Sequence, residues 1–400
     1  MKILVVHPRF DLRGGAENVI AWLAQGLSRR GHSVAVATRH FDAKRWRSDA
    51  WDRVPIHLLR KPRAPWPGTR ARRTQRIGRS VASLASDSDL VVAHNFPAAV
   101  WATSARRWQH LPRVIWYCHE PLARLHWRAA YPTLSGVCDA EDERYPWARG
   151  AFREVATRMQ ARPPHRSQID RELDFSAVAQ LDGILANSAF TAEMVARTYE
   201  RSAVPCPPGV PAPPAASGKR STRPYVALIT TPSPPKNAVG FLEALRIAVH
   251  ERGARDLRVR AAGIGSDFLR AVAAEAGLAE IVAFEPWLAE AELHELIAGC
   301  RLLVYPSIEE PFGLVPIEAM AHGRPVVASN RGGTCESVVP GVTGLLSDAL
   351  DPAAMADAML ALWNDPSRCD QLGAAGRDRY LDHFTLDHFV ERFEKLALAS

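Results

Sequence analysis

The stretch that most constrains the fold runs from residue 302 to residue 346. It begins with the apolar run Leu302 to Tyr305 and continues into a turn rich in proline, serine and glutamate. Phe312 and Gly313 then open a predicted helix, and the run from Pro325 to Ser329 predicts a second buried strand. The stretch therefore predicts a strand, a loop, a helix and a strand in succession.

Two glutamates lie close to the start of this helix. Glu310 lies in the loop before it, and Glu318 lies eight residues later, about two helical turns along. The amides of Phe312, Gly313 and Leu314 lie at the helix N-terminus, where unpaired N–H groups and the helix dipole favour an anion. This order suits the sugar, the diphosphate and the ribose of a nucleotide sugar. Two glutamates alone are also compatible with ordinary surface charges.

The residues around these glutamates carry a resemblance to a known family. The stretch resembles the signature of the retaining glycosyltransferases of family 4, the glycosyl transferases of group 1, which have the GT-B fold. The matching residues are Glu310-Pro311-Phe312-Gly313, Glu318 to Ala321, Gly323 to Ser329, Gly332-Gly333 and Glu336. The resemblance implies an α/β protein with two Rossmann-like, doubly wound domains that face a cleft.

Length and composition agree with two domains that contain no membrane span. Four hundred residues exceed one ordinary hydrophobic core. No apolar run approaches the roughly 18 residues that cross a bilayer, and Lys2 to His7 is typical of a first strand rather than a signal peptide. We therefore expect a cytoplasmic protein. The six cysteines show no Cys-x-x-Cys spacing, which argues against a disulfide framework and a zinc site.

A proline-rich segment marks the predicted domain boundary. Cys206 to Gly218 can hold neither a helix nor a central strand. We predict an acceptor-side domain over residues 1–205, a linker over 206–222 and a nucleotide-sugar-binding domain over 223–383. In the family the last helix, here residues 384–400, packs back on the first domain.

Positive charge is concentrated in the first half of the chain. Residues 1–200 contain 31 lysines and arginines against 19 aspartates and glutamates, a net charge of +12, whereas residues 201–400 have a net charge of −5. Eight of the cations lie in residues 60–79, which contain no acidic residue. This stretch is either a solvated loop or a patch that attracts an anionic membrane surface, at the inner face of the membrane. No nucleic-acid-binding motif accompanies it.

A glycine turn follows the first predicted strand. Gly14 and Gly15 precede a predicted helix, on the carboxyl side of the sheet where open α/β folds bind ligands. The pair alone is compatible with a simple tight turn. Gly-Gly-Ala-Glu also resembles the family's first loop, which closes over the donor diphosphate and the acceptor.

His119 is the candidate active-site residue of the first domain. It follows the apolar strand Val114 to Tyr117, a place where a lone histidine is more often structural. Tyr-Cys-His-Glu-Pro-Leu-Ala-Arg, however, resembles a segment of family members similar to bacterial mannosyltransferases, in which the histidine reaches the transferred sugar. The aromatic and arginine-rich residues 122–175 suit either an acceptor-facing surface or packing against the sheet.

The cations expected around the donor diphosphate are only partly present. In the family an arginine lies six residues before a lysine, and Lys236 occupies the lysine position whereas Thr230 occupies the arginine position. Arg331 is a candidate for the missing charge. Trp287 lies in the loop that holds the base in the family.

The resemblance implies a metal-independent hexosyltransferase that requires no cofactor besides its nucleotide-sugar donor. Lys236 and the helix N-terminus would stabilise the leaving diphosphate. Glu310 would bind hydroxyls of the transferred sugar, Glu318 the ribose, and His119 the sugar. A donor phosphate oxygen would take the acceptor proton, so no protein nucleophile is needed.

Donor and acceptor stay open at this point. GDP-mannose and UDP-sugars are both compatible with the motifs, and we expect a glycan or lipid-linked acceptor of cell-surface polysaccharide or glycolipid synthesis. A soluble small acceptor is the alternative. A GT-B binding protein with impaired catalysis is a third reading, because Thr230 replaces a cation.

Overall fold

The structure of the chain is a computed structural model with two compact units. It describes residues 1–11, 13–46, 51, 53–59, 70–139, 164–214, 221–263, 266–286 and 288–398. The first unit comprises Met1–Ala130, Arg162–Gly209 and Leu386–Ser400, and the second comprises Tyr131–Ala161 and Val210–Thr385. Residues 131–139, which the sequence predicted to be part of the first domain, group with the second unit. Glu309 contributes to this grouping through hydrogen bonds from the amides of Thr133 and Leu134.

The first unit is built on a parallel sheet of seven strands. Their order is β3-β2-β1-β4-β5-β6-β7, so β1 lies inside the sheet and pairs with β2 on one side and β4 on the other. Val5 lies opposite both Val36 and Val92, and all five residues of β4 are buried. The strands are β1 (Lys2–Phe10), β2 (Ser33–Phe41), β3 (Ile56–Leu58), β4 (Leu90–His94), β5 (Arg113–Cys118), β6 (Gly183–Ala186) and β7 (Val204–Pro205).

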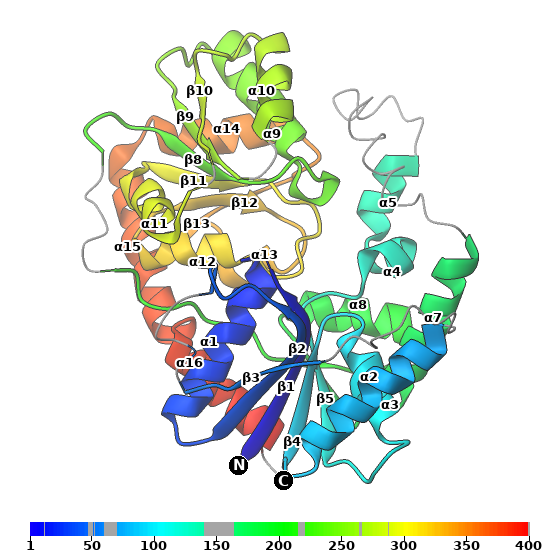
Figure 1. Ribbon diagram of the computed structural model, residues 1–400. Helices are drawn as coiled ribbons and strands as arrows, with labels where there is room; N and C mark the ends of the chain where they lie inside the picture. Colours follow the sequence, from blue (N-terminus) through cyan, green and yellow to red (C-terminus); the bar gives the residue numbers. More distant parts are fainter. Residues whose placement is uncertain are drawn as a thin grey trace. The chain divides into compact units, whose positions relative to one another are not determined.

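Helices cover both faces of this sheet. In Figure 1, α1 and α16 lie on one side of the strands and α2 and α3 on the other. The last helices belong to this unit, because the Phe389 ring lies 5.9 Å from that of Tyr117 and Glu394 accepts hydrogen bonds from Arg30 and His32. The helices are α1 (Gly15–Arg29), α2 (Arg70–Ala85), α3 (Ala98–Ala105), α4 (Ala123–Ala130), α7 (Pro164–Ala179), α8 (Ala189–Tyr199), α16 (Leu386–Phe393) and η5 (Glu394–Leu398).

The second unit is built on a parallel sheet of six strands. Their order is β10-β9-β8-β11-β12-β13, with β8 and β11 paired at the centre. The strands are β8 (Val226–Ile229), β9 (Val259–Ala262), β10 (Val282–Phe284), β11 (Leu302–Tyr305), β12 (Val326–Ser329) and β13 (Gly344–Ser347). The helices are α5 (Pro132–Asp139), η3 (Pro234–Lys236), α9 (Ala238–Arg246), η4 (Ile247–Glu251), α10 (Ser266–Glu275), α11 (Glu290–Gly299), α12 (Leu314–Ala321), α13 (Thr334–Ser337), α14 (Pro352–Trp363) and α15 (Pro366–His383).

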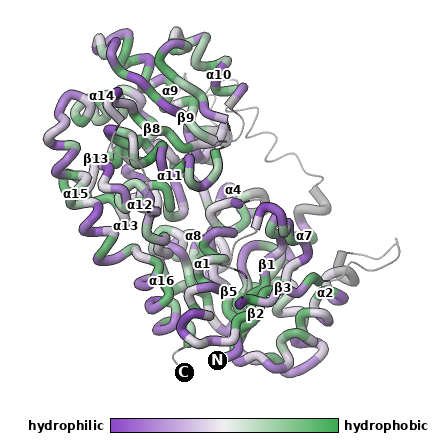
Figure 2. The backbone as a smooth tube through the Cα atoms, turned by 60° about the vertical axis from the view of Figure 1, so that its left-hand side comes forward, coloured by the Kyte–Doolittle hydropathy of each residue, from purple (hydrophilic) through white to green (hydrophobic). Residues whose placement is uncertain are grey.

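Both sheets have the same type of strand order, and this order predicts where a ligand binds. Each strand order reverses direction once, between β1 and β4 in the first unit and between β8 and β11 in the second. Open parallel sheets bind ligands at the carboxyl ends of the strands beside such a reversal. The apolar strands that form these sheets are green in Figure 2, whereas α15 carries hydrophilic stretches.

Within the described part of the chain, no helix combines the length and the apolar character that crossing a membrane requires.

Candidate functional site

The second unit gathers the predicted donor residues at its strand reversal. After β8 the chain passes Thr230 and enters η3, which ends at Lys236. After β11 the chain enters the loop that carries Glu310 and leads into α12. Because β8 and β11 are neighbouring parallel strands, both loops leave the sheet at the same edge.

The local sequence around Lys236 explains its placement. Pro234 and Pro235 start the single turn of η3, where their missing N–H groups cost no hydrogen bond. Asn237 ends the turn with a φ of +50°, a conformation that asparagine tolerates. Its side-chain amide donates to the carbonyl oxygens of Pro306 at 3.2 Å and Ala349 at 2.7 Å, which ties the turn to the β11 loop.

Lys236 and Glu310 form an ion pair at this edge. Lys236 Nζ lies 2.7 Å from Glu310 Oε2 and donates to the Tyr305 hydroxyl at 3.1 Å. Glu310 is 9% exposed, and the Lys236 side chain is 32% exposed. Burial alone would lower the pKa of Lys236, but Glu310 and Tyr305 hold that pKa above its ordinary value. The site therefore contains a stable cation.

The N-terminus of α12 provides amides beside this pair. Gly313 precedes the helix with a φ of +91°, which glycine adopts without strain. As the N-cap residue, Gly313 has no side chain that could cap this end of the helix. The amides predicted from Phe312, Gly313 and Leu314 therefore lie at a helix end suited to an anion, while the Phe312 side chain itself is buried.

Backbone contacts hold the Glu310 loop in place. The Ile308 amide donates to Pro235 O at 2.8 Å, and the Gly333 amide donates to Glu310 O at 2.7 Å. Gly332 approaches so closely that a Cβ atom there would lie 2.5 Å from Glu310 O. Gly332 and Gly333 of the signature thus pack against the Glu310 loop and hold its backbone in place.

Glu309 was missed by the sequence analysis. It is buried, has a φ of +50°, and its carboxylate accepts from the amides of Thr133 at 3.2 Å and Leu134 at 2.8 Å. It therefore caps the N-terminus of α5, where a carboxylate is favourable. Two successive glutamates were the only available signal, and they do not show which one faces the ligand.

Glu318 lies on α12 in a different setting. It is half-buried, and burial, followed by the nearby charge of Glu290, raises its pKa to about 7. A carboxyl group near its pKa at neutral pH can accept a hydrogen bond from a hydroxyl or donate one to it. No hydrogen bond joins Glu318 to Lys236 or Glu310 among the described residues, whereas Lys236 and Glu310 contact each other directly.

Arg331, the candidate for the second cation, pairs with an acidic side chain. Thr230 is buried at the end of β8, and its hydroxyl donates to the carbonyl oxygen of Thr231. The Arg331 guanidinium pairs with Asp348 at 3.0 and 3.3 Å, so its charge is neutralised locally. Trp287, the candidate for the base, lies outside the described residues.

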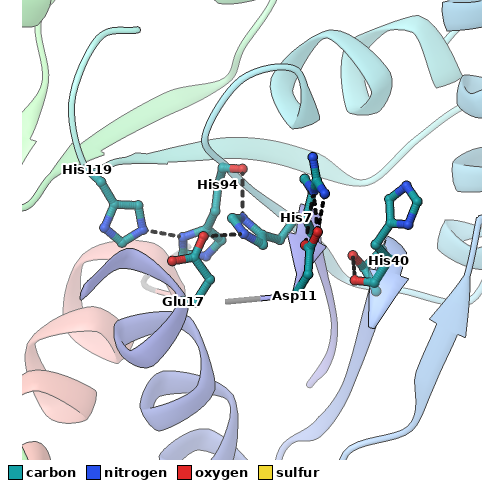
Figure 3. A network of polar contacts seen from close by, with 8 residues as sticks. His7, Asp11, Glu17, His40, His94 and His119 are labelled. Atoms are coloured by element: carbon teal, nitrogen blue, oxygen red, sulfur yellow. Dashed lines mark hydrogen bonds and ion pairs between the residues drawn. The ribbon is translucent and has the colours of Figure 1, made fainter. Parts of the chain in front are cut away.

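The first unit brings three histidines together from three neighbouring strands. His94 ends β4, His119 directly follows β5, and His7 lies within β1, three residues before its end. Figure 3 shows them in one network with Glu17. His94 Nδ1 lies 3.1 Å from His119 Nε2, His7 Nδ1 donates to His94 O at 3.4 Å, and His7 Nε2 lies 3.2 Å from Glu17 Oε1. His119 was predicted as a site residue from the sequence, whereas the network was not.

Burial sets the charge of His119. Its side chain is buried, and burial, followed by the charge of His7, lowers its pKa to about 3. His119 is therefore a neutral imidazole at physiological pH.

The two predicted glycines lie beside this network. Gly14 is the N-cap of α1, and Gly15 is the first residue of that helix. A Cβ atom at Gly14 would lie 2.5 Å from Glu17 Oε2. Gly14 thus leaves the space that the Glu17 carboxylate occupies.

Both halves of the chain match models of known protein families. Residues 13–212 match the model described as Glycosyltransferase Family 4. The chain belongs to this family. Residues 212–379 match the model described as Glycosyl transferases group 1, so the two family segments follow each other. The family predicted from the signature is confirmed.

Relatives among curated proteins include two kinds of glycosyltransferase. D-inositol 3-phosphate glycosyltransferase of Thermobispora bispora is 33% identical over 226 residues, which are 51% of this chain and 52% of that protein. Alpha-1,3/1,6-mannosyltransferase ALG2 of Mus musculus is 24% identical over 424 residues, covering 98% of this chain and 94% of that protein. The chain thus matches about half the length of the first relative and nearly all of the second.

Solved structures share the fold over the whole chain. Sucrose-phosphate synthase from Thermosynechococcus elongatus aligns with a TM-score of 0.74 at 19% identity, covering 99% of this chain and 98% of that one. Anabaena Alr3699/HepE in complex with UDP and glucose aligns with a TM-score of 0.71 at 18% identity, covering both chains fully. The predicted GT-B fold is confirmed.

Proposed function

We propose that the chain transfers a hexose from a nucleotide diphosphate sugar to a glycan or lipid-linked acceptor, with retention of the anomeric configuration. The observation that carries the proposal is the Lys236–Glu310 pair beside the uncapped N-terminus of α12, at the strand reversal of the second unit. A cation, free amides and a carboxylate at one edge match a leaving diphosphate and a sugar.

In the proposed reaction the bond between the anomeric carbon and the donor phosphate oxygen breaks. The bond to the acceptor oxygen forms on the same face, and the acceptor proton passes to a donor phosphate oxygen. Lys236 and the α12 amides stabilise the negative charge that develops on the diphosphate. Glu310 accepts hydrogen bonds from hydroxyls of the transferred sugar.

Two further residues have proposed roles in recognition. Glu318, with a pKa raised to about 7, exchanges hydrogen bonds with the ribose hydroxyls. His119 contacts the sugar as a neutral imidazole that donates one hydrogen bond and accepts another. The reaction as proposed uses no metal and no further cofactor.

Two nucleotides remain candidates for the donor. The Tyr-Cys-His segment and the mannosyltransferase relative support GDP-mannose. The structural neighbour in complex with UDP and glucose supports a UDP-sugar. Trp287, in the loop expected to hold the base, is the residue whose surroundings would distinguish them.

Thermal stabilisation by nucleotides tests the proposal. Among UDP, GDP, ADP and TDP, one is expected to raise the Tm more than its own monophosphate does. A ligand that binds only the folded state, at 100 times its Kd, stabilises that state by about 2.7 kcal/mol. The measurement is a melting curve for each nucleotide and its common sugars. Equal melting temperatures with every nucleotide would contradict the proposal.

A binding protein with impaired catalysis is the second candidate. The observation that favours it is Thr230, which leaves one cation where the family has two. Both candidates predict stabilisation by a nucleotide diphosphate, but only the enzyme predicts transfer of a labelled sugar. Transfer in the presence of the stabilising donor and candidate acceptors therefore separates them.

A lipid-linked acceptor is supported by one exposed surface of the first unit. Arg76 and Arg79 are exposed on α2, and the Arg79 guanidinium lies 5.1 Å from the ring centroid of Trp108, which is 48% exposed. Cations beside an exposed tryptophan suit the interface of an anionic membrane. The other cations of the predicted basic patch lie in residues 60–73, whose side chains the structure does not describe.

Vesicle binding separates a lipid-linked acceptor from a soluble one. The protein is expected to co-sediment with vesicles that contain phosphatidylglycerol and not with neutral vesicles. The bound fraction should fall as salt increases, because screening weakens attraction between exposed charges. Failure to bind anionic vesicles at moderate salt would favour a soluble small acceptor.

A further inference from the structure

Tyr305, the last residue of β11, contacts the site cation but has no role in the function described so far. We propose that Tyr305 is a positioning residue that aims the Lys236 ammonium at the second phosphate of the donor, and so gives the site its preference for diphosphates. The inference rests on the proposed function, because it assigns Lys236 to the donor diphosphate. Tyr305 is buried, and its hydroxyl lies 3.1 Å from Lys236 Nζ.

The geometry leaves one N–H of the ammonium for a ligand. A lysine ammonium has three donors. Lys236 Nζ directs one to Glu310 Oε2 and one to the Tyr305 hydroxyl. Among the residues that the structure describes, no other group accepts from Lys236, and its side chain is partly exposed. Two fixed partners therefore set the direction of the third N–H.

A phenol suits this role because it orients the cation without cancelling its charge. Glu310 is an anion and offsets the charge of Lys236. Burial, followed by the charge of Glu310, raises the pKa of Tyr305 to about 12, so its hydroxyl stays neutral. Nζ lies 3.1 Å from the hydroxyl but 5.5 Å from the ring centroid, so the ammonium meets the hydroxyl end of the ring rather than its face.

The same ring contacts the start of α12. A Cβ atom on Gly313 would lie 3.3 Å from Tyr305 Cε1, so the ring packs against this turn. One side chain thus sets the position of both parts of the proposed phosphate site, the cation and the helix N-terminus. Thr230 provides no second cation. The direction of the Lys236 ammonium therefore affects diphosphate binding more than it would if an arginine also bound the diphosphate.

The variant Tyr305→Phe removes the hydroxyl and keeps the ring. Its affinity for the preferred nucleoside diphosphate is expected to fall about tenfold, the effect of losing one hydrogen bond to a charged group. Its affinity for the monophosphate should not change, because that ligand lacks the second phosphate. The measurement is titration calorimetry with both nucleotides. A merely structural role would weaken both ligands alike.

The matched control is Tyr225→Phe. Tyr225 is also buried in the second unit, and its hydroxyl donates to Leu296 O at 2.8 Å, outside the proposed site. This variant is expected to keep the wild-type ratio of the two affinities. A double-mutant cycle adds a second test, since Tyr305→Phe should have no effect in a Lys236→Gln background if Tyr305 acts through Lys236.

The outcomes distinguish this inference from the proposed function. A wild-type ratio in Tyr305→Phe, equal losses for both nucleotides, or a full effect in the Lys236→Gln background would overturn the role of Tyr305 while leaving the donor site standing. If the wild-type protein itself binds no diphosphate more tightly than its monophosphate, the proposed function fails first. The role of Tyr305 is then overturned with it.

Discussion

Replacing Glu310 with glutamine is expected to lower the rate of sugar transfer by about 100-fold to 1,000-fold. Glutamine keeps the shape of the side chain but removes the negative charge that pairs with Lys236 Nζ at 2.7 Å. The proposed site then loses an acceptor for the sugar hydroxyls and the fixed direction of its cation. Losses of this size are typical when one preorganised electrostatic group is removed from an active site.

The measurement is initial transfer rate at saturating donor, with circular dichroism to check the fold. Glu243→Gln is the matched control, because Glu243 also pairs with a cation, Arg246, on α9 of the same unit. That variant is expected to retain the wild-type rate. Wild-type transfer by Glu310→Gln would mean that the carboxylate has no part in the reaction.

Replacing Gly332 with alanine is expected to lower the free energy of unfolding by about 3–5 kcal/mol. Gly332 has a φ of +78°, and a Cβ atom there would lie 2.5 Å from Glu310 O and 2.7 Å from Glu310 N. Left-handed strain and overpacking against backbone therefore add together. Because the obstacle is the main chain of Glu310, transfer activity should fall as well.

Gly341→Ala separates these two causes. Gly341 has nearly the same φ, +77°, but nothing lies within 4 Å of a Cβ atom built there. This variant retains only the strain, and we expect a loss of about 1–2 kcal/mol. Urea unfolding of both variants is the measurement. Equal losses would show that the close approach to Glu310 has no effect on stability.

Much of the fold could be predicted because its strands are short apolar runs between turn residues. Leu302 to Tyr305 and Val326 to Ser329 are strands as predicted, and every residue of both is buried. These strands could be predicted because short apolar runs between turns are typical of a sheet that is covered on both faces. The same logic placed the loops of Lys236 and Glu310 at strand ends.

The contacts within the site could not be predicted in the same way. Tyr305 reads in sequence as one more apolar strand residue, and its hydrogen bond joins residues 69 positions apart. The network of His7, His94 and His119 depends on the order of three strands, which the chain alone does not display. Arg331 was a candidate for the second cation because it is an arginine in a nearby turn. Its guanidinium pairs with Asp348, 17 residues later.

The two adjacent carboxylates of the β11 loop contact two parts of the second unit that lie far apart in the sequence. The φ of +50° at Glu309 lets its side chain cap α5 while Glu310 pairs with Lys236. The main chain of this loop thus links the Lys236 ion pair to the amides of Thr133 and Leu134, some 175 residues earlier. If the proposed sugar binds Glu310, the start of α5 is joined to the sugar position through two consecutive residues.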